Sequence, residues 1–139
     1  MRKINLMWLP TLLAGMLCSC NQQTEVEVMS DLTERSVGEV DKSSTVLTGA
    51  EWLLRNTGNF RLRVDSIKSS CECLEVQKKE SMTAKPGGYF PVRVFLHPEQ
   101  VDTGAFVREV EVYGNFPSSP LVLTLTGRIV DSSDEQCEP

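Results

Sequence analysis

The sequence predicts an all-β domain in which short strands form a two-layer sandwich. Two observations predict this class. Apolar and polar residues alternate in several runs after residue 30, and residues that favour turns separate these runs. The length agrees, because the part of the 139-residue chain that follows the first 19 residues is sufficient for a single domain with one hydrophobic core.

Residues 1–19 are typical of an export signal. Arg2 and Lys3 precede an apolar run from Ile4 to Leu17, which is shorter than the roughly 20 residues that a membrane-spanning helix needs. The run ends at Leu17-Cys18-Ser19-Cys20, which is similar to a bacterial lipobox. This resemblance implies cleavage before Cys20 and acylation of Cys20, with palmitate among the acyl chains. We therefore expect a lipoprotein signal peptide; an uncleaved N-terminal anchor helix is the alternative.

Residues 20–30 are polar and acidic, and we interpret them as a lipidated tether between membrane and domain. Because Glu25, Val26, Glu27 and Val28 alternate with a period of two, a first edge strand is the alternative. Asn21 is not the aspartate that is associated with inner-membrane retention. Its resemblance to known sorting signals favours the outer membrane of a Gram-negative bacterium, with the face of that membrane left open.

Several runs within residues 31–130 have the period of strands with one face in a core. Their apolar positions are Ala50, Trp52 and Leu54; Phe60, Leu62 and Val64; Phe90, Val92, Val94 and Leu96; Val110 and Val112; and Leu121, Leu123 and Leu125. Residues 56–59, 86–88, 102–104 and 114–117 separate the runs and contain Asn, Gly and Pro, which favour turns. We therefore expect Trp52 and Leu54 to lie in the core.

Five motifs in this region together resemble a known family. They are Asn56-Thr57-Gly58-Asn59, Ser70-Cys71-Glu72-Cys73, Pro86-Gly87, Gly104-Ala105-Phe106 and Gly127-Arg128-Ile129. In this order they are similar to a family of bacterial lipoprotein domains of unknown function, related to hydin-type and PapD-like domains. The resemblance implies an immunoglobulin-like β-sandwich of about seven antiparallel strands over residues 31–130, and it brings no established activity. The family usually has glycine where this chain has Glu72.

The charge balance argues against nucleic acid as a partner. Loss of residues 1–19 would leave 12 basic and 19 acidic residues, a formal net charge of −7. Proteins that bind nucleic acid rely on clustered Lys and Arg against the phosphates. The last segment, residues 131–139, is acidic and without periodicity, and we expect it to be a flexible tail.

The folded part would retain three cysteines, Cys71, Cys73 and Cys137. Residues two apart in an extended strand are about 6.6 Å from each other, near the upper limit for a disulfide, so a bond between Cys71 and Cys73 needs a bent backbone. Free thiols, a bridge from one of the pair to Cys137, and redox or metal chemistry all stay open. An odd number of cysteines leaves one thiol free unless two chains pair.

No residues in the sequence form a recognisable catalytic or metal site. His97 is the only histidine, and together with the three cysteines its spacing matches no compact zinc pattern. A cysteine protease would need a further group to orient that histidine. We therefore expect no catalytic residue, no metal and no cofactor, and interpret His97 as a solvated residue at a strand end.

Two exposed features are candidates for contact with a partner. Phe116 precedes Pro117 in a polar loop, where it either contacts a partner or folds back onto the end of the sandwich. Arg61 and Arg63 share one face of a predicted strand and would suit an anionic partner, although such arginines are usually a solvated face.

These observations favour a membrane-anchored, non-catalytic binding or scaffolding module in the cell envelope over an enzyme. Its partners would be the membrane, through the lipid, and another envelope protein. That protein would dock at an open sheet edge or at the loops of one end, for example by adding a strand. A thiol-dependent redox or metal-handling lipoprotein that uses Cys71 and Cys73 is the alternative.

Overall fold

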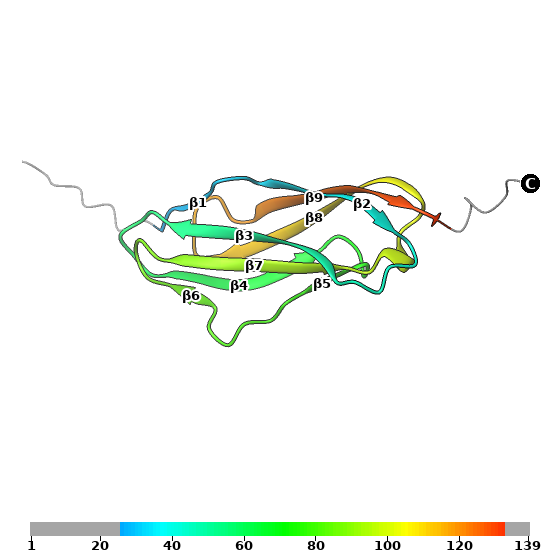
Figure 1. Cartoon of the computed structure of the whole chain (residues 1–139). Helices are drawn as coiled ribbons and strands as arrows, with labels where there is room; N and C mark the ends of the chain where they lie inside the picture. The colour runs from blue at the N-terminus through cyan, green and yellow to red at the C-terminus, as the bar shows by residue number, and fades with distance from the viewer. Residues whose placement is uncertain (1–25, 133–139) are drawn as a thin grey trace, which may run out of the picture.

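A computed structural model describes residues 26–132, which form nine strands and one short 3₁₀ helix (Figure 1). The strands are β1 (Val28–Ser30), β2 (Glu34–Asp41), β3 (Thr48–Asn56), β4 (Leu62–Ser69), β5 (Leu74–Val76), β6 (Thr83–Ala84), β7 (Tyr89–Leu96), β8 (Gly104–Gly114) and β9 (Leu121–Val130), and the helix is η1 (Pro98–Gln100). The predicted signal peptide, Cys20 and Cys137 lie outside the described residues.

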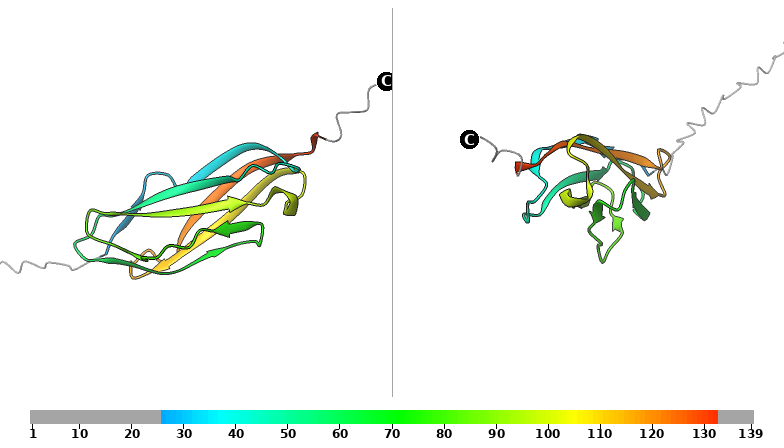
Figure 2. Two further views of the ribbon diagram at one scale, coloured as in Figure 1. Left: turned by 60° about the horizontal axis from the view of Figure 1, so that its bottom comes forward. Right: turned by 90° about the vertical axis from the view of Figure 1, so that its right-hand side faces the viewer.

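The strands form two sheets that pack face to face (Figures 1 and 2). One sheet has the order β1-β3-β7-β5 and the other β2-β9-β8-β4-β6. The prediction of a β-sandwich is therefore confirmed. One pairing differs from the expected antiparallel pattern: the chain passes from the first sheet to the second after β1, and β2 then pairs with β9 in parallel.

The core between the sheets contains the apolar positions of the alternating runs. Trp52 and Leu54 of β3 are fully buried, as the sequence predicts, and so are Phe90, Val92, Val94 and Leu96 of β7 and Leu123 and Leu125 of β9. Each such side chain contributes roughly 1.5–3 kcal/mol of hydrophobic stabilisation. Among the described residues, Asn56 is the one polar residue that is fully buried.

Two predictions need correction. Phe60 is not an inward residue of a strand, because β4 begins at Leu62 and Phe60 lies in the preceding turn with 55% of its surface exposed. The last residues of the predicted tether are part of the sandwich. Val28–Ser30 pair with β3 and Val26 is buried, so the alternative of an edge strand is confirmed for that stretch.

The described chain begins and finishes at opposite ends of the sandwich (Figures 1 and 2). We call the first the Val26 end; it contains Val26 and the turns at 57–61, 85–88 and 115–120. The other, the Val130 end, contains the end of β9, the β2–β3 connection and the turn at 71–73. No helix within residues 26–132 is long and apolar enough to cross a membrane.

Candidate functional site

One long side of the sandwich is only partly covered by strands. β7 pairs with β3 along its whole length, but on its other side it pairs with the three residues of β5. β4 pairs with β8 on one side, whereas the two residues of β6 cover only the start of its other side. We call this the open side: the outer edges of β4 and β7 with β5, β6 and the connection at 77–82, which bulges away from the sheets in Figure 1.

The uncovered part of β7 runs from Tyr89 to Val92. The backbone of Gln77 donates to the carbonyl of Arg93 (2.9 Å), and that of His97 donates to the carbonyl of Cys73 (2.8 Å). The odd-numbered residues of β7 therefore direct their backbone groups toward β5. Pro91 belongs to this set and has no N–H, which is typical of an edge position. In the described residues no strand pairs with this part of the edge.

An apolar cavity of about 340 Å³ lies between the two uncovered edges. Ile67 of β4, Val76 of β5, Met82 and Phe90 line it together with Pro91. Gln77, Lys78 and Lys79 line it from the connection, and the Lys79 ammonium lies 5.8 Å from the centre of the Phe90 ring. The cavity thus offers an apolar interior and a basic rim.

The segment from residue 55 to residue 93, which supplies most of the open side, has an excess of basic residues although the chain is acidic. Residues 55–93 contain eight basic and four acidic residues, and the basic ones are Arg55, Arg61, Arg63, Lys68, Lys78, Lys79, Lys85 and Arg93. Arg63 pairs with Asp65 (2.9 Å), and Arg93 pairs with Glu51. This part of the chain supplies β4, β5, β6 and most of β7, so its charge favours an acidic partner on this side.

The two cysteines of the Ser70-Cys71-Glu72-Cys73 motif form a disulfide. Their Cα atoms are 5.2 Å apart, so the backbone is bent as the spacing argument requires, and Cys73 is buried. The bond lies in the turn where the chain crosses from β4 in one sheet to β5 in the other. Because Cys71 and Cys73 bond to each other, neither is free to bridge to Cys137.

His97 directly follows β7, where it is partly exposed and lies between two carboxylates. Its Nε2 is 3.2 Å from Oε2 of Glu75, and its Nδ1 is 3.5 Å from Oε1 of Glu99. Within residues 26–132 no group of three or more His, Cys, Asp or Glu side chains is arranged to hold a metal ion.

Phe116 folds back onto the end of the sandwich, which is the second of the two alternatives. Only 4% of its surface is exposed, because the ring folds back into the core at the Val26 end. A Cβ at Gly114 would lie 2.8 Å from the ring, so glycine is required there for this packing. The alternative that Phe116 folds back is therefore confirmed: the loop that carries it turns inward against β8.

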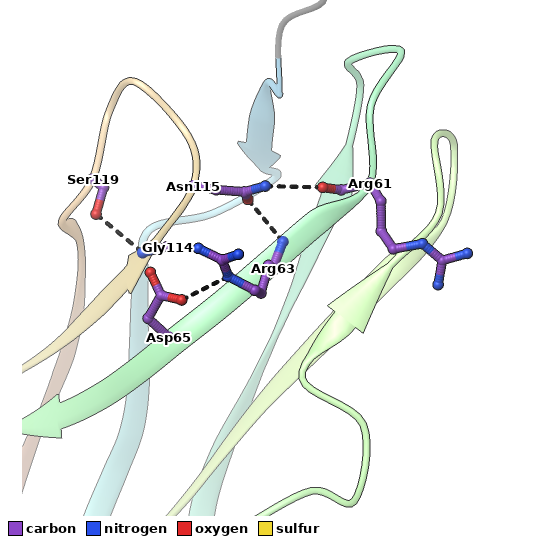
Figure 3. Close-up of polar contacts among 6 residues, drawn as sticks. All are labelled: Arg61, Arg63, Asp65, Gly114, Asn115 and Ser119. Atoms are coloured by element: carbon purple, nitrogen blue, oxygen red, sulfur yellow. Dashed lines mark hydrogen bonds and ion pairs between the residues drawn. The ribbon is translucent and has the colours of Figure 1, made fainter.

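Asn115, the neighbour of Phe116, fixes the start of β4 (Figure 3). Its Oδ1 accepts from the backbone of Arg63 (2.7 Å), and its Nδ2 donates to the carbonyl of Arg61 (3.0 Å). Gly114 donates to the Ser119 hydroxyl (3.1 Å), which holds the loop beyond it. The Arg61 side chain points away from Asn115 in Figure 3. The sequence offered no signal for this role of Asn115.

Residues 26–129 match a family model described as "Protein of unknown function (DUF1573)". The chain belongs to this family. The DUF1573 domain therefore extends over nearly all of the described residues, which agrees with the resemblance drawn from the motifs. A search of curated proteins finds no match.

Solved structures show the same fold as this DUF1573 domain. A protein of unknown function from Porphyromonas gingivalis W83 is 18% identical, with a TM-score of 0.64 over 81% of this chain and 51% of that one. The chain thus spans about half of that protein. PapD-like domain 7 of human CEP192 is 12% identical (TM-score 0.59; 92% and 99% covered), and the E. coli chaperone DraB is 12% identical (0.53; 75% and 56%). The fold is PapD-like and immunoglobulin-like.

Proposed function

We propose that this DUF1573 protein is a lipid-anchored, non-catalytic binding module of the cell envelope, and that its open side binds an extended segment of another envelope protein. The single observation that carries the proposal is the edge of β7 between Tyr89 and Val92, which has backbone groups directed outward and no paired strand in the described residues. A segment that adds to this edge would form main-chain hydrogen bonds, while pockets would select its side chains.

The cavity beside that edge supports a particular kind of segment. Its apolar interior of about 340 Å³ accommodates a large apolar side chain, and Lys78 and Lys79 at the rim favour an acidic neighbour. The bound segment would therefore be extended, with an apolar residue next to an acidic one.

A crosslinking experiment tests this docking. A photoreactive amino acid at Gln77, beside the cavity, should capture one defined envelope protein in living cells. The same group at Val122, an exposed residue on the other sheet, is the matched control and should capture none. Equal capture from both positions, or none from Gln77, would contradict docking at the open side.

A cavity-filling variant sharpens the result. Ile67→Trp places a large ring in the cavity, so the yield of the Gln77 crosslink should fall about tenfold, because one well-packed apolar contact is worth about that much affinity. Val107→Trp, at an exposed position of β8, should leave the yield unchanged. Circular dichroism of both variants checks that the sandwich is intact.

The anchor is the second part of the proposal. Cys20 would carry the lipid, and Asn21 beside it favours the outer membrane. Cells fed radiolabelled palmitate should incorporate label into the wild type and into Cys18→Ser, but not into Cys20→Ser. Label that persists in Cys20→Ser would refute the anchor.

A further inference from the structure

The Val26 end exposes three large apolar side chains. Met29, Phe60 and Tyr89 each leave between 54% and 57% of their surface in solvent. Met29 is the register partner of Arg55, and Arg55 is the partner of Tyr89. Met29 and Tyr89 therefore lie in one row across the first sheet, with Arg55 between them. Phe60 belongs to the adjoining turn, where Thr57 donates to the carbonyl of Glu27 (2.8 Å) and holds that turn against the start of the chain.

A basic hollow lies beside Tyr89, at one end of this row. It has a volume of about 520 Å³ and is lined by Arg61, Lys85 and Tyr89, together with the residues from Pro86 to Gly88. Arg61 reaches it because Asn115 holds the Arg61 carbonyl while the guanidinium points the other way (Figure 3). Within residues 26–132 neither Arg61 nor Lys85 makes an ion pair with a carboxylate.

The length of the chain before Val26 limits how far this end lies from the anchor. Five residues lie between Cys20 and Val26, so the two Cα atoms are six steps apart and at most about 20 Å from each other in a fully extended chain. A lipid on Cys20 would thus keep the Val26 end near the membrane surface and the Val130 end away from it.

We propose that the Val26 end docks onto the anionic surface of the membrane, with Phe60 and Tyr89 at the interface and lipid phosphates beside Arg61 and Lys85. Aromatic side chains bind at the level of the headgroups, and basic residues near an anionic surface strengthen the contact by about 1 kcal/mol each. This proposal rests on the lipid anchor of the proposed function. It implies that the open side is presented laterally, parallel to the membrane.

The opposite end provides an internal comparison. Val46 and Leu47 are even more exposed, at 72% and 71%. However, their connection follows Asp41 directly and carries one basic residue, Lys42, whose backbone donates to the carbonyl of Val130 (2.8 Å). Apolar exposure is therefore common to both ends, and the basic residues distinguish the Val26 end as the one that suits an anionic membrane.

Tryptophan fluorescence tests which end touches lipid. The full lipidated protein is incorporated into vesicles of phosphatidylcholine, either pure or mixed with phosphatidylglycerol, that contain brominated lipids as quenchers. Trp52 is fully buried and contributes a constant background. Emission from Phe60→Trp should shift to the blue and be quenched in the mixed vesicles, and less so in pure phosphatidylcholine. Val46→Trp is the matched control and should be neither shifted nor quenched.

Charge reversal identifies the role of the basic residues. In the Phe60→Trp background, Arg61→Glu with Lys85→Glu should abolish the extra quenching in mixed vesicles, whereas reversal of Lys42 should not. Quenching of Val46→Trp, or of neither position, would overturn the proposal. Co-sedimentation of the protein with vesicles at high salt distinguishes failure of the docking proposal from failure of the anchor. A protein that sediments with the vesicles but shows no quenching refutes docking alone. A protein that does not sediment refutes the anchor as well.

Discussion

The two long sides of the sandwich are held together in different ways. On one side, which we call the paired side, β2, β9 and β8 pair along most of their length, so that ladders of backbone hydrogen bonds join them, with one bulge between Ser36 and Glu39 of β2. On the open side, β5 and β6 contribute three and two residues. The chain between them forms no strand, and its backbone bonds to the sheets at its two ends, where Gln77 donates to the carbonyl of Arg93 (2.9 Å) and Met82 accepts from the backbone of Val64 (2.8 Å). The stability of the paired side is therefore distributed over many backbone hydrogen bonds, whereas the stability of the open side depends on a few particular side chains.

Asn56 is the most important of these side chains. It is fully buried at the end of β3. Its Nδ2 donates to the carbonyls of Phe60 (2.7 Å) and Ala84 (3.2 Å), and its Oδ1 accepts from the backbone of Gly58 (3.2 Å). Its own backbone pairs with the turn at 87–88. One side chain thus links β3, the β3–β4 turn and β6.

Replacing Asn56 by alanine should therefore have the largest effect. The variant loses three hydrogen bonds and leaves the Ala84 carbonyl buried without its Asn56 donor, which predicts a loss of about 3 kcal/mol in the free energy of unfolding. Urea denaturation followed by circular dichroism measures it. The matched control is Asn115→Ala, which also loses hydrogen bonds to Arg61 and Arg63 but at an exposed residue, where water replaces them; about 1 kcal/mol is expected. Equal losses of stability in the two variants would show that the burial of Asn56 does not make its hydrogen bonds more costly to lose.

The Cys71–Cys73 disulfide is the second feature that stabilises the open side. It closes a very short loop in the turn between the two sheets, so its effect on the unfolded chain is small, and Cys71→Ser with Cys73→Ser should cost about 1.5 kcal/mol. Hydrogen exchange should speed up in β5 and leave β9 unchanged, because only β5 depends on this turn. Faster exchange throughout the domain would contradict the contrast between the two sides.

The same double variant tests the thiol-dependent alternative for the function. A binding module whose disulfide only holds a turn should keep its Gln77 crosslink and its cellular phenotype after both cysteines are replaced. Loss of the phenotype in a folded double variant that keeps its crosslink would favour the redox alternative over the binding function.

The strands that the sequence predicts are those with regular alternation. In β7 every second residue from Phe90 to Leu96 is apolar and buried, so the period of two is uninterrupted. β2 has no such signal, because Val37 and Val40 are three residues apart on either side of a bulge at Gly38. The bulge changes which residues face the core. The prediction that Phe60 is an inward residue of a strand was wrong for a related reason. The alternation of apolar and polar residues does not show where a turn ends and a strand begins.

The open side could not be predicted from the sequence. Whether Tyr89–Val92 has a neighbour depends on the path of residues 77–82, and that segment carries no periodicity. The spacing of Cys71 and Cys73 permits a bond only with a bent backbone, so the sequence left the choice open until the turn was known. The burial of Asn56 could not be predicted either, because the turn motif at 56–59 explains an asparagine at this position equally well.

Substitution of Gly38 examines the paired side. Gly38 has a φ of +72° at the bulge in β2, and a Cβ there would meet nothing within 4 Å. The cost of Gly38→Ala is therefore conformational, and about 1 kcal/mol is expected, measured as a lower Tm in thermal denaturation. Glu39→Ala, at the next residue, is the control and should change the Tm little. A loss of stability as large as that expected for Asn56→Ala would show that the paired side also depends on a single residue.

The smallest effect is expected at Asp41, where β2 ends. Its carboxylate accepts hydrogen bonds from the hydroxyls of Ser132 and Ser43, and these bonds lower the pKa of Asp41 below its ordinary value of 3.8. Because the folded pKa is lower than the unfolded one, the stabilisation is present above pH 3.8 and is lost as the pH falls through the folded value. Asp41→Asn should thus be slightly less stable than the wild type at pH 7, and the difference should disappear in acid. Urea denaturation at several pH values measures this, and a difference that grows below pH 3.8 would contradict it, since protonation removes the charge that the two serines stabilise.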